Sequence, residues 1–107
     1  MEEKVQDPVK VAPEIYKVLL ENDLVRVLEI HLKPGGHSPM HSHPAYIAYA
    51  LTDSKVRFTL ADGKTKELEM KAGEAAWSDA ESHAVDNIGS TEARVLNIEL
   101  KGYTKGQ

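Results

Sequence analysis

Residues 35–44 of this 107-residue chain read GGHSPMHSHP and place two histidines, His41 and His43, two positions apart. On an extended strand, residues i and i+2 point to the same face and lie about 7 Å apart along the strand. Two imidazoles at that spacing can turn toward one ion and bind it through bonds of about 2.0–2.1 Å. Because Pro44 has no amide hydrogen for a ladder bond, we expect this stretch at a strand entrance or at the mouth of a barrel.

The composition limits the chemistry and the partners. The chain has no cysteine, which excludes a disulfide scaffold, a thiolate metal site and a cysteine nucleophile. Any metal must therefore bind imidazole or oxygen ligands. With 13 basic and 17 acidic residues the net charge is −4, and without a basic stripe we expect no nucleic-acid partner. Neither a signal peptide nor a membrane-spanning apolar run is apparent, so we expect a soluble, cytoplasmic protein without a membrane partner.

Short apolar segments separated by turn residues predict an all-β protein. The strongest local pattern is a pair of alternating runs, at 56–60 and 67–70, on either side of Asp62-Gly63. This pattern predicts a hairpin in which both turn residues have positive φ. Further strand candidates lie at 15–20, 24–32, 45–51, 75–78, 83–88 and 95–100. Because no window keeps a helical period with caps, we expect a single β-barrel or sandwich domain over 15–107. Residues 1–14 are interpreted as an N-terminal arm or edge strand.

A third metal ligand must come from elsewhere in the chain, and His83 is the only histidine downstream of His43. His83 opens an apolar segment. If that segment is a strand facing the first across a barrel, three neutral imidazoles meet at one point. Three protein ligands leave positions open for water or substrate, which is typical of a catalytic rather than a structural site.

The two histidine segments resemble the conserved motifs of the cupins. Residues 35–43 match the first motif, G-x5-H-x-H, and residues 73–87 resemble the second. The hairpin expected at 56–70 falls between them, as it does in cupins, and the likeness extends over 24–100. The resemblance implies a double-stranded β-helix, or jelly-roll barrel. It also implies that the family's three histidine positions are filled by His41, His43 and His83.

Two departures from the cupin pattern bear on function. Cupins usually carry a glutamate about four residues after the second histidine, where this chain has Ile47 or Ala48. In the second motif, the usual proline and glycine are replaced by Ser78 or Asp79 and by Ala80. The site therefore resembles that of three-histidine cupins such as the cysteine and diketone-cleaving dioxygenases. The alternative is a cupin that has lost its metal, with its histidines hydrogen-bonded in a polar mouth.

The loss of the glutamate bears on the cofactor. An ion held by three neutral ligands keeps its full charge and favours an anionic or chelating oxygen ligand. Iron(II) suits this arrangement if oxygen is used, and manganese, nickel or zinc would also fit three imidazoles.

Other polar and aromatic residues fit either the site or ordinary structural roles. We expect His37, in a Gly/Pro loop, at the surface or beside the ligands rather than among them. Aromatic walls suit small-molecule pockets, but packing in the core or at a subunit interface would also explain the aromatic candidates, Tyr46, Tyr49 and Trp77.

Residues 95–100 alternate, and we interpret their aliphatic members, Leu96, Ile98 and Leu100, as core residues. Glu99 is then expected in solvent, although it could instead replace the missing carboxylate. His31 is expected to face away from the site, and Asn87 to be a structural turn residue.

Two classes of function follow. The first is a metal-dependent enzyme, oxygenase-like or isomerase/lyase-like, acting on a small oxygen-rich or carbonyl compound. The second is a non-catalytic module that binds a metal or a small ligand. By family habit, and because edge strands need cover, a homodimer is also expected.

Overall fold

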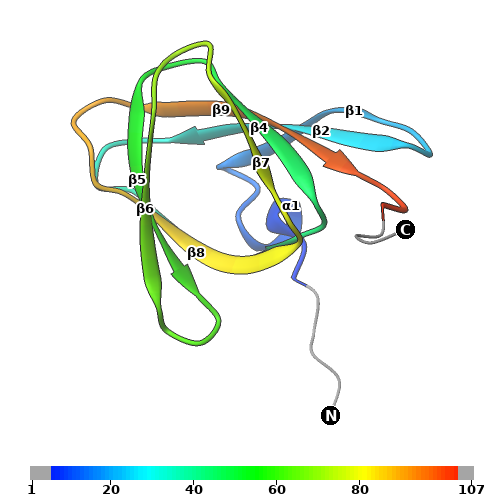
Figure 1. The fold of residues 1–107 in the computed structure, drawn as a ribbon, viewed down its shortest axis with the longest axis horizontal. Helices are drawn as coiled ribbons and strands as arrows, with labels where there is room; N and C mark the ends of the chain where they lie inside the picture. Colours follow the sequence, from blue (N-terminus) through cyan, green and yellow to red (C-terminus); the bar gives the residue numbers. More distant parts are fainter. Residues whose placement is uncertain (1–5, 104–107) are drawn as a thin grey trace.

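The computed structural model describes residues 6–103, and within them nine strands and one short helix follow one another (Figure 1). The helix is α1 (Pro8–Val11). The strands are β1 (Tyr16–Glu21), β2 (Val25–Leu32), β3 (His37–His43), β4 (Tyr46–Ala50), β5 (Ser54–Leu60), β6 (Thr65–Met70), β7 (Ala75–Ser78), β8 (Glu81–Asn87) and β9 (Ala93–Leu100). No helix in this part of the chain is long and apolar enough to cross a membrane.

The strands form two antiparallel sheets that make a jelly-roll barrel, as the sequence predicts. One sheet has the order β1-β2-β9-β4-β7 and the other the order β3-β8-β5-β6. In Figure 1, β5 and β6 stand on one side of the barrel, β8 crosses below, and β9 and β2 run along the top. The core between the sheets contains a buried apolar cluster, to which Tyr16, Leu28, Leu32, Val85 and Ala93 belong.

The N-terminal segment contains a helix where we expected an arm or edge strand. Asp7 accepts a hydrogen bond from the Val9 amide at 3.0 Å, and Pro8 occupies the first helical position. An aspartate cap followed by proline is a standard helix start, and here it begins a single turn that the sequence interpretation overlooked. The segment is packed, because Ala12 is 1% exposed. Residues 1–5 of the expected arm lie outside the described residues.

The hairpin between β5 and β6 forms where the sequence predicts it, but its turn differs. Gly63 has φ of +88°, whereas no described residue other than glycine has positive φ, so the expectation for Asp62 was wrong. The Gly63 amide donates to the Leu60 carbonyl at 2.9 Å, and the Leu60 amide donates to the Lys64 carbonyl at 2.7 Å. The loop is longer than two residues, so only the glycine needs the left-handed region.

Strand β9 faces the opposite way from our expectation. Asn97 and Glu99 are 3% and 2% exposed and point into the barrel, while Leu96, Ile98 and Leu100 lie on the outer face of their sheet. The alternation was correctly recognised, but its apolar side was wrongly assigned to the core. The polarity of the side chains does not indicate which face of β9 is buried, because this barrel encloses a polar cluster and exposes an apolar surface.

Candidate metal centre

A bulge in β3 brings its histidines to the inner face of the barrel. β3 pairs with β8, but the partners change from Ser38 with Val85 to His41 with His83, so β3 has one extra residue between these pairs. In a regular strand Ser38 and His41, three positions apart, would point to opposite faces, and the bulge puts both on the same face. Both are fully buried. Proline is tolerated at bulges, which fits Pro39 within this stretch.

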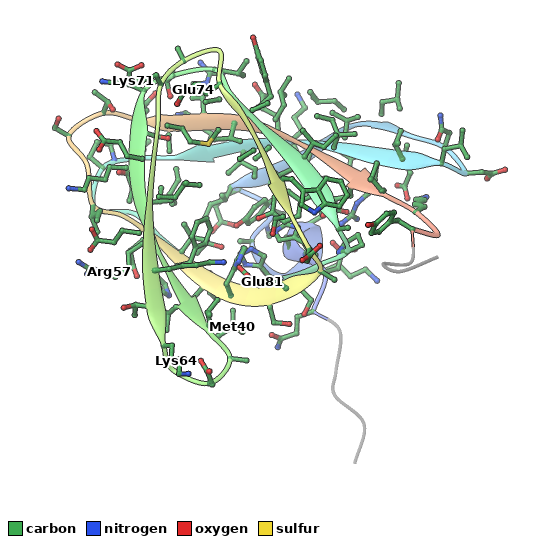
Figure 2. All side chains as sticks on the ribbon, viewed as in Figure 1. Met40, Arg57, Lys64, Lys71, Glu74 and Glu81 are labelled. Carbon is green, nitrogen blue, oxygen red and sulfur yellow. The ribbon has the colours of Figure 1, made fainter. Side chains whose placement is uncertain are left out.

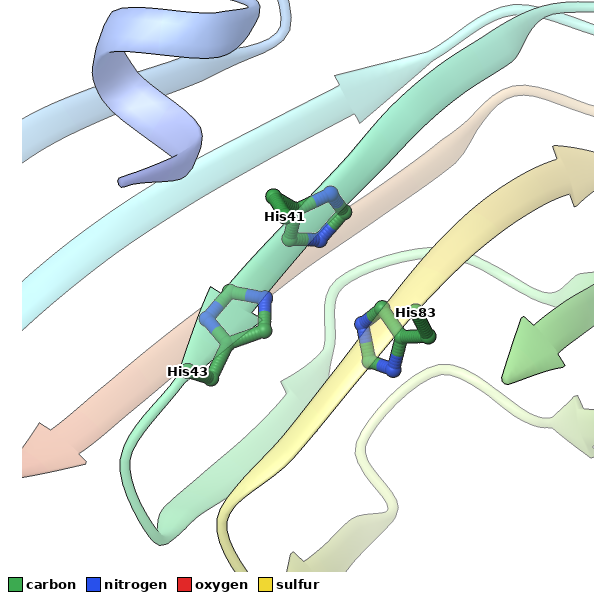
Figure 3. Close-up of side chains that lie close together, drawn as sticks. All are labelled: His41, His43 and His83. Atoms are coloured by element: carbon green, nitrogen blue, oxygen red, sulfur yellow. The ribbon is translucent and has the colours of Figure 1, made fainter. Parts of the chain in front are cut away.

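The three histidines meet, as the sequence predicts. His41 lies directly opposite His83 in the β3–β8 ladder, and His43 follows two positions later on the same face (Figure 3). One ligand nitrogen from each ring lies within 4.8 Å of the other two. The ring centroids are 4.8, 4.8 and 5.3 Å apart, and His41 and His83 are 0% and 1% exposed.

Each imidazole is oriented by an acceptor at its Nδ1 atom. Carboxylate oxygens lie 2.6 Å from two of these atoms, that of Glu99 at His43 and that of Glu81 at His83. In His41, Nδ1 lies 2.7 Å from the Pro39 carbonyl oxygen. Since a carbonyl and an ionised carboxylate only accept, each Nδ1 carries the hydrogen, and in a neutral ring Nε2 then presents a lone pair. Metal-binding histidines usually have such partners.

The two carboxylates are themselves paired with cations. Glu99 accepts from Arg26 Nε at 3.0 Å, and Arg26 also donates to Asp7 at 3.1 Å. Glu81 accepts from Lys66 Nζ at 2.8 Å. Burial raises the pKa of Glu81, but its hydrogen bonds with Lys66 and His83 outweigh this effect and lower the pKa overall. Our expectation that Glu99 is solvated was therefore wrong, and the sequence interpretation missed Glu81 altogether.

His41 and His83 are held in the neutral form that binds metals. The pKa of His41 is lowered to about 3, mainly by burial and also by the neighbouring His43 and His83, although the hydrogen bond to the Pro39 carbonyl raises it. Burial likewise lowers the pKa of His83 to about 4, although the hydrogen bond to Glu81 raises it. At neutral pH both rings are therefore uncharged, and a metal would not have to displace a proton from either of them.

Tyr16 contacts the centre from β1, which the sequence did not indicate. Its hydroxyl lies 3.1 Å from His41 Nε2 and 2.9 Å from Ser38 Oγ, and the residue is buried. Burial raises the pKa of this hydroxyl, so it remains a proton donor. It can therefore donate either to the lone pair of His41 or to Ser38.

A cavity of about 240 Å³ adjoins the centre, and His43 and His83 form part of its wall. The other lining residues are largely apolar and include Val56, Phe58 and Met70. Phe58 lies against His83 with ring centroids 4.6 Å apart. The cavity therefore provides an apolar chamber beside three imidazoles.

The three aromatic pocket candidates are placed differently. Tyr46 is buried in the cavity wall, Trp77 borders the cavity but is 49% exposed, and Tyr49 lies outside it. Trp77 donates to Asp79 at 3.1 Å and contacts Tyr103 edge-on. Only Tyr46 is thus enclosed beside the cluster.

The remaining polar candidates lie outside the cluster. His37 is at the surface and pairs with Asp86 at 2.8 Å, and His31 lies 3.0 Å from Glu92 on the other sheet. Asn87 is structural as expected, because its amide donates to the Leu32 and Thr91 carbonyl oxygens, both at 2.9 Å.

The donor set fits a divalent ion. A tetrahedral ion with bonds of about 2.0–2.1 Å holds two nitrogens about 3.4 Å apart, so ring nitrogens up to 4.8 Å apart would have to approach one another by up to about 1.4 Å. At the position of the usual cupin glutamate, Ala48 lines the cavity, whereas Ile47 alternates to the outer face. Neither side chain binds metals, so the centre has three histidine donors with carboxylates behind two of them.

Comparison with known proteins agrees with this architecture. The cupin domain model matches residues 28–99, while comparison with curated proteins gives no match. A cupin domain from Bordetella pertussis Tohama I is 23% identical, with a TM-score of 0.75 over 94% of this chain and 100% of that one.

Two further solved structures share the fold at lower similarity. A conserved double-stranded β-helix protein from Klebsiella pneumoniae is 19% identical, with a TM-score of 0.65 over 94% of this chain and 92% of that one. Oxalate decarboxylase from Bacillus subtilis is 22% identical, with a TM-score of 0.57 over 74% of this chain and 22% of that one. With the family model matching most of its length, and with the barrel and histidine cluster described above, the chain belongs to the cupin family.

Proposed function

We propose that this cupin is a metal-dependent enzyme. It would bind one divalent ion through His41, His43 and His83 and act on a small compound that has an oxygen donor and a largely apolar body. The observation that carries the proposal is the orientation of the three rings. An acceptor holds every Nδ1, so the three Nε2 atoms are left for one ligand beside a cavity, and the Tyr16 hydroxyl that contacts His41 Nε2 can donate to Ser38 instead. A cluster that was merely hydrogen-bonded would not need this common arrangement.

The ion, when bound, would act as a Lewis acid for a carbonyl or carboxylate oxygen or would bind dioxygen. Iron(II) suits the second role, and manganese, nickel or zinc also fit three imidazoles. The carboxylate of Glu81 makes the ring of His83 more basic, and the carboxylate of Glu99 accepts from His43 in the same arrangement. They therefore supply in part the negative charge that cupins usually provide through a glutamate ligand.

The cavity wall supports a substrate with a hydrocarbon body. Its lining is mainly aliphatic and aromatic, which favours a carbonyl or carboxylate compound carrying an apolar group over a small dianion such as oxalate. The Tyr46 hydroxyl can serve as a hydrogen-bond donor to a bound oxygen. Burial raises its pKa to about 12, so this hydroxyl keeps its proton at neutral pH.

Metal binding is tested by elemental analysis of the untagged protein. We expect close to one equivalent of a divalent metal per chain after loading, and much less in His83→Ala. The matched control is His37→Ala, which removes a surface histidine and should leave the metal content unchanged. Equal metal content in wild type and His83→Ala would contradict the proposal.

Catalysis is tested with protein that is loaded with iron(II) anaerobically and then mixed with air-saturated buffer. Oxygen uptake is followed with β-diketones, catechols and cysteine-like thiols, and product formation is followed for isomerase or lyase chemistry on carbonyl compounds. Turnover that disappears in His83→Ala but persists in His37→Ala supports the enzyme. Ligand-dependent thermal shifts without turnover would instead support the non-catalytic binding module.

A further inference from the structure

The side chain of Asn97 is buried without a hydrogen-bond partner. Asn97 is 3% exposed, lies on the inner face of β9 and forms part of the cavity wall. A side-chain amide has two hydrogens to donate and an oxygen that accepts. The amide of Asn97 uses none of them with any described residue of the chain. Because the side chain faces inward, the amide is directed into the cavity.

The other two asparagines of the chain have partners within the protein. Asn87 is also 3% exposed, but its Nδ2 donates to the Leu32 and Thr91 carbonyl oxygens and its Oδ1 accepts from the Gly89 amide, each at 2.9 Å. At the surface, Asn22 accepts from two backbone amides. Buried polar groups in folded proteins are nearly always hydrogen-bonded. An amide that the chain leaves without a partner therefore indicates that a ligand or an ordered water completes it.

The place of Asn97 favours a ligand, because the residue lies beside the histidine centre. Glu99, two positions further along the same face of β9, accepts from His43 at 2.6 Å. In the neighbouring strand β4, Asn97 pairs with Ala48, which also lines the cavity. Directly opposed residues on adjacent strands have Cβ atoms about 4.5–5.5 Å apart. The single methyl group of Ala48 therefore leaves room for a ligand in front of the amide.

The chemistry of this corner of the cavity favours a carboxylate. An ion bound by three neutral histidines keeps its full charge and favours an anionic oxygen ligand. A carboxylate has two oxygens, and when one of them binds the ion the other needs a hydrogen-bond donor. The Asn97 amide is a donor that no described protein group uses.

The rest of the cavity favours a hydrocarbon chain and a single carboxylate. Among the described lining residues Lys66 is the only lysine or arginine, and its ammonium is already paired with Glu81 at 2.8 Å. Figure 2 shows Glu81 on the inner side of β8, where it contacts His83. A second carboxylate would find no free cation in this lining, whereas Val56 and Met70 offer apolar contacts.

We propose that Asn97 recognises the substrate by donating from Nδ2 to the second oxygen of a metal-bound, short-chain monocarboxylate. This inference rests on the proposed function, because the first oxygen binds the ion held by the three histidines. A site built to hydrogen-bond a ligand rejects compounds that lack the matching group, since they leave its buried polar atom without a partner. Asn97 therefore sets the specificity, while the histidines hold the metal.

The stability of the metal-free protein tests whether the amide has a structural role. Asn97→Leu keeps the branched shape of the side chain but removes a buried amide that the folded protein leaves without a partner. We expect its urea midpoint to equal or exceed that of the wild type. The matched variant Asn87→Leu loses three hydrogen bonds and should have a lower midpoint. A folded Asn97→Leu with a lower midpoint than the wild type would overturn the proposal.

Recognition is tested with butanoate as the probe, by calorimetric titration of the cobalt(II)-loaded protein. Asn97→Leu should bind cobalt(II) like the wild type but bind butanoate about 10- to 100-fold more weakly, because it lacks a hydrogen bond to a charged oxygen. The control is Ser54→Ala, which removes a cavity hydroxyl at the opposite end of β5 from Leu60, the partner of His83. It should bind butanoate like the wild type.

The outcomes separate this inference from the proposed function. If the wild type binds cobalt(II) but not butanoate, or if Asn97→Leu binds butanoate as tightly as the wild type, the inference is wrong and the metal centre stands. If the wild type does not bind cobalt(II), the proposed function is wrong, and this inference with it.

A measurement on the unmodified sequence keeps the test decisive if Asn97→Leu does not fold. In the nitrogen-15-labelled, zinc(II)-loaded protein, butanoate should shift the side-chain amide signals of Asn97 and leave those of Asn87 in place. Asn97 signals that do not move while butanoate binds would show that the carboxylate uses another donor and would refute the assignment.

Discussion

Replacing Glu99 by glutamine is expected to weaken metal binding without disrupting the barrel. The Glu99 carboxylate is buried, accepts the proton of His43 Nδ1 at 2.6 Å, and is paired with Arg26 at 3.0 Å. Glutamine preserves the size and one acceptor oxygen but removes the negative charge that faces the His43 ring. Loss of such a partner typically lowers metal affinity by about 10- to 100-fold. This corresponds to about 1.4–2.7 kcal/mol of binding free energy.

The same substitution also affects stability, and the two effects can be separated. Removing one partner of a buried charge pair can cost about 3–5 kcal/mol of unfolding free energy, because the remaining charge is left uncompensated. Here Arg26 keeps its contact with Asp7, so we expect a cost toward or below the lower end of that range. Urea unfolding of the metal-free proteins measures this cost independently of the metal.

The assay is competition for cobalt(II) or zinc(II) against a chelator of known affinity. Glu67→Gln is the matched control, because Glu67 is a carboxylate paired with Arg57 on the outer face of the other sheet. It should bind metal like the wild type. If folded Glu99→Gln bound metal as tightly as the wild type, the idea that this carboxylate orients and polarises His43 would be refuted.

Three further predictions concern neighbouring residues and conditions. Tyr16→Phe should raise metal affinity about fivefold, because it removes a hydroxyl donor whose hydrogen bond to His41 Nε2 is worth about 1 kcal/mol. The same chelator competition measures this affinity. Weaker metal binding in Tyr16→Phe would show that the hydroxyl assists the metal. The metal-free protein should lose stability as the pH falls from about 6.5 toward 4, because the pKa values of His41 and His83, about 3 and 4 in the folded state, lie below the unfolded value. The unfolded chain then binds up to two more protons than the folded protein, so the free energy of unfolding falls by up to about 3 kcal/mol per pH unit. Urea midpoints that do not change with pH would contradict this prediction. Leu28→Ala should lower the free energy of unfolding by about 3–5 kcal/mol, because Leu28 is fully buried. The control Leu24→Ala should leave it nearly unchanged, because Leu24 is 72% exposed. Equal urea midpoints for the two variants would exclude this packing role of Leu28.

The strands and the histidine trio were predictable because they depend on local patterns. The alternating runs around Gly63 gave the correct hairpin, and the spacing of His41 and His43 correctly placed both rings on one face. The bulge that lets Ser38 join them has no signal of its own beyond Pro39. The expectation that the two histidine segments meet in the barrel rested on the resemblance to a family and not on the periodicity of the strands.

The carboxylate partner of His43 was not predictable, for two physical reasons. Glu99 lies 56 positions from His43 in the chain, and its strand carries aliphatic residues on the side that we assigned to the core. Polarity indicates the inside of a strand only when the interior side chains are apolar and the exterior ones are polar, and neither condition holds for β9. Glu81, by contrast, could have been predicted from the sequence, because it precedes His83 by two positions and therefore shares its face of the strand.

The central claim is that the Nε2 atoms of three histidines bind one ion. The most direct measurement is an anomalous-difference map from crystals of the metal-loaded protein, recorded at the absorption edge of that metal. We predict one strong peak about 2.0–2.2 Å from the Nε2 atoms of His41, His43 and His83, with Glu81 and Glu99 still hydrogen-bonded at Nδ1. A peak beside His37 and Asp86 instead, or no peak among the three rings at full metal loading, would contradict the account.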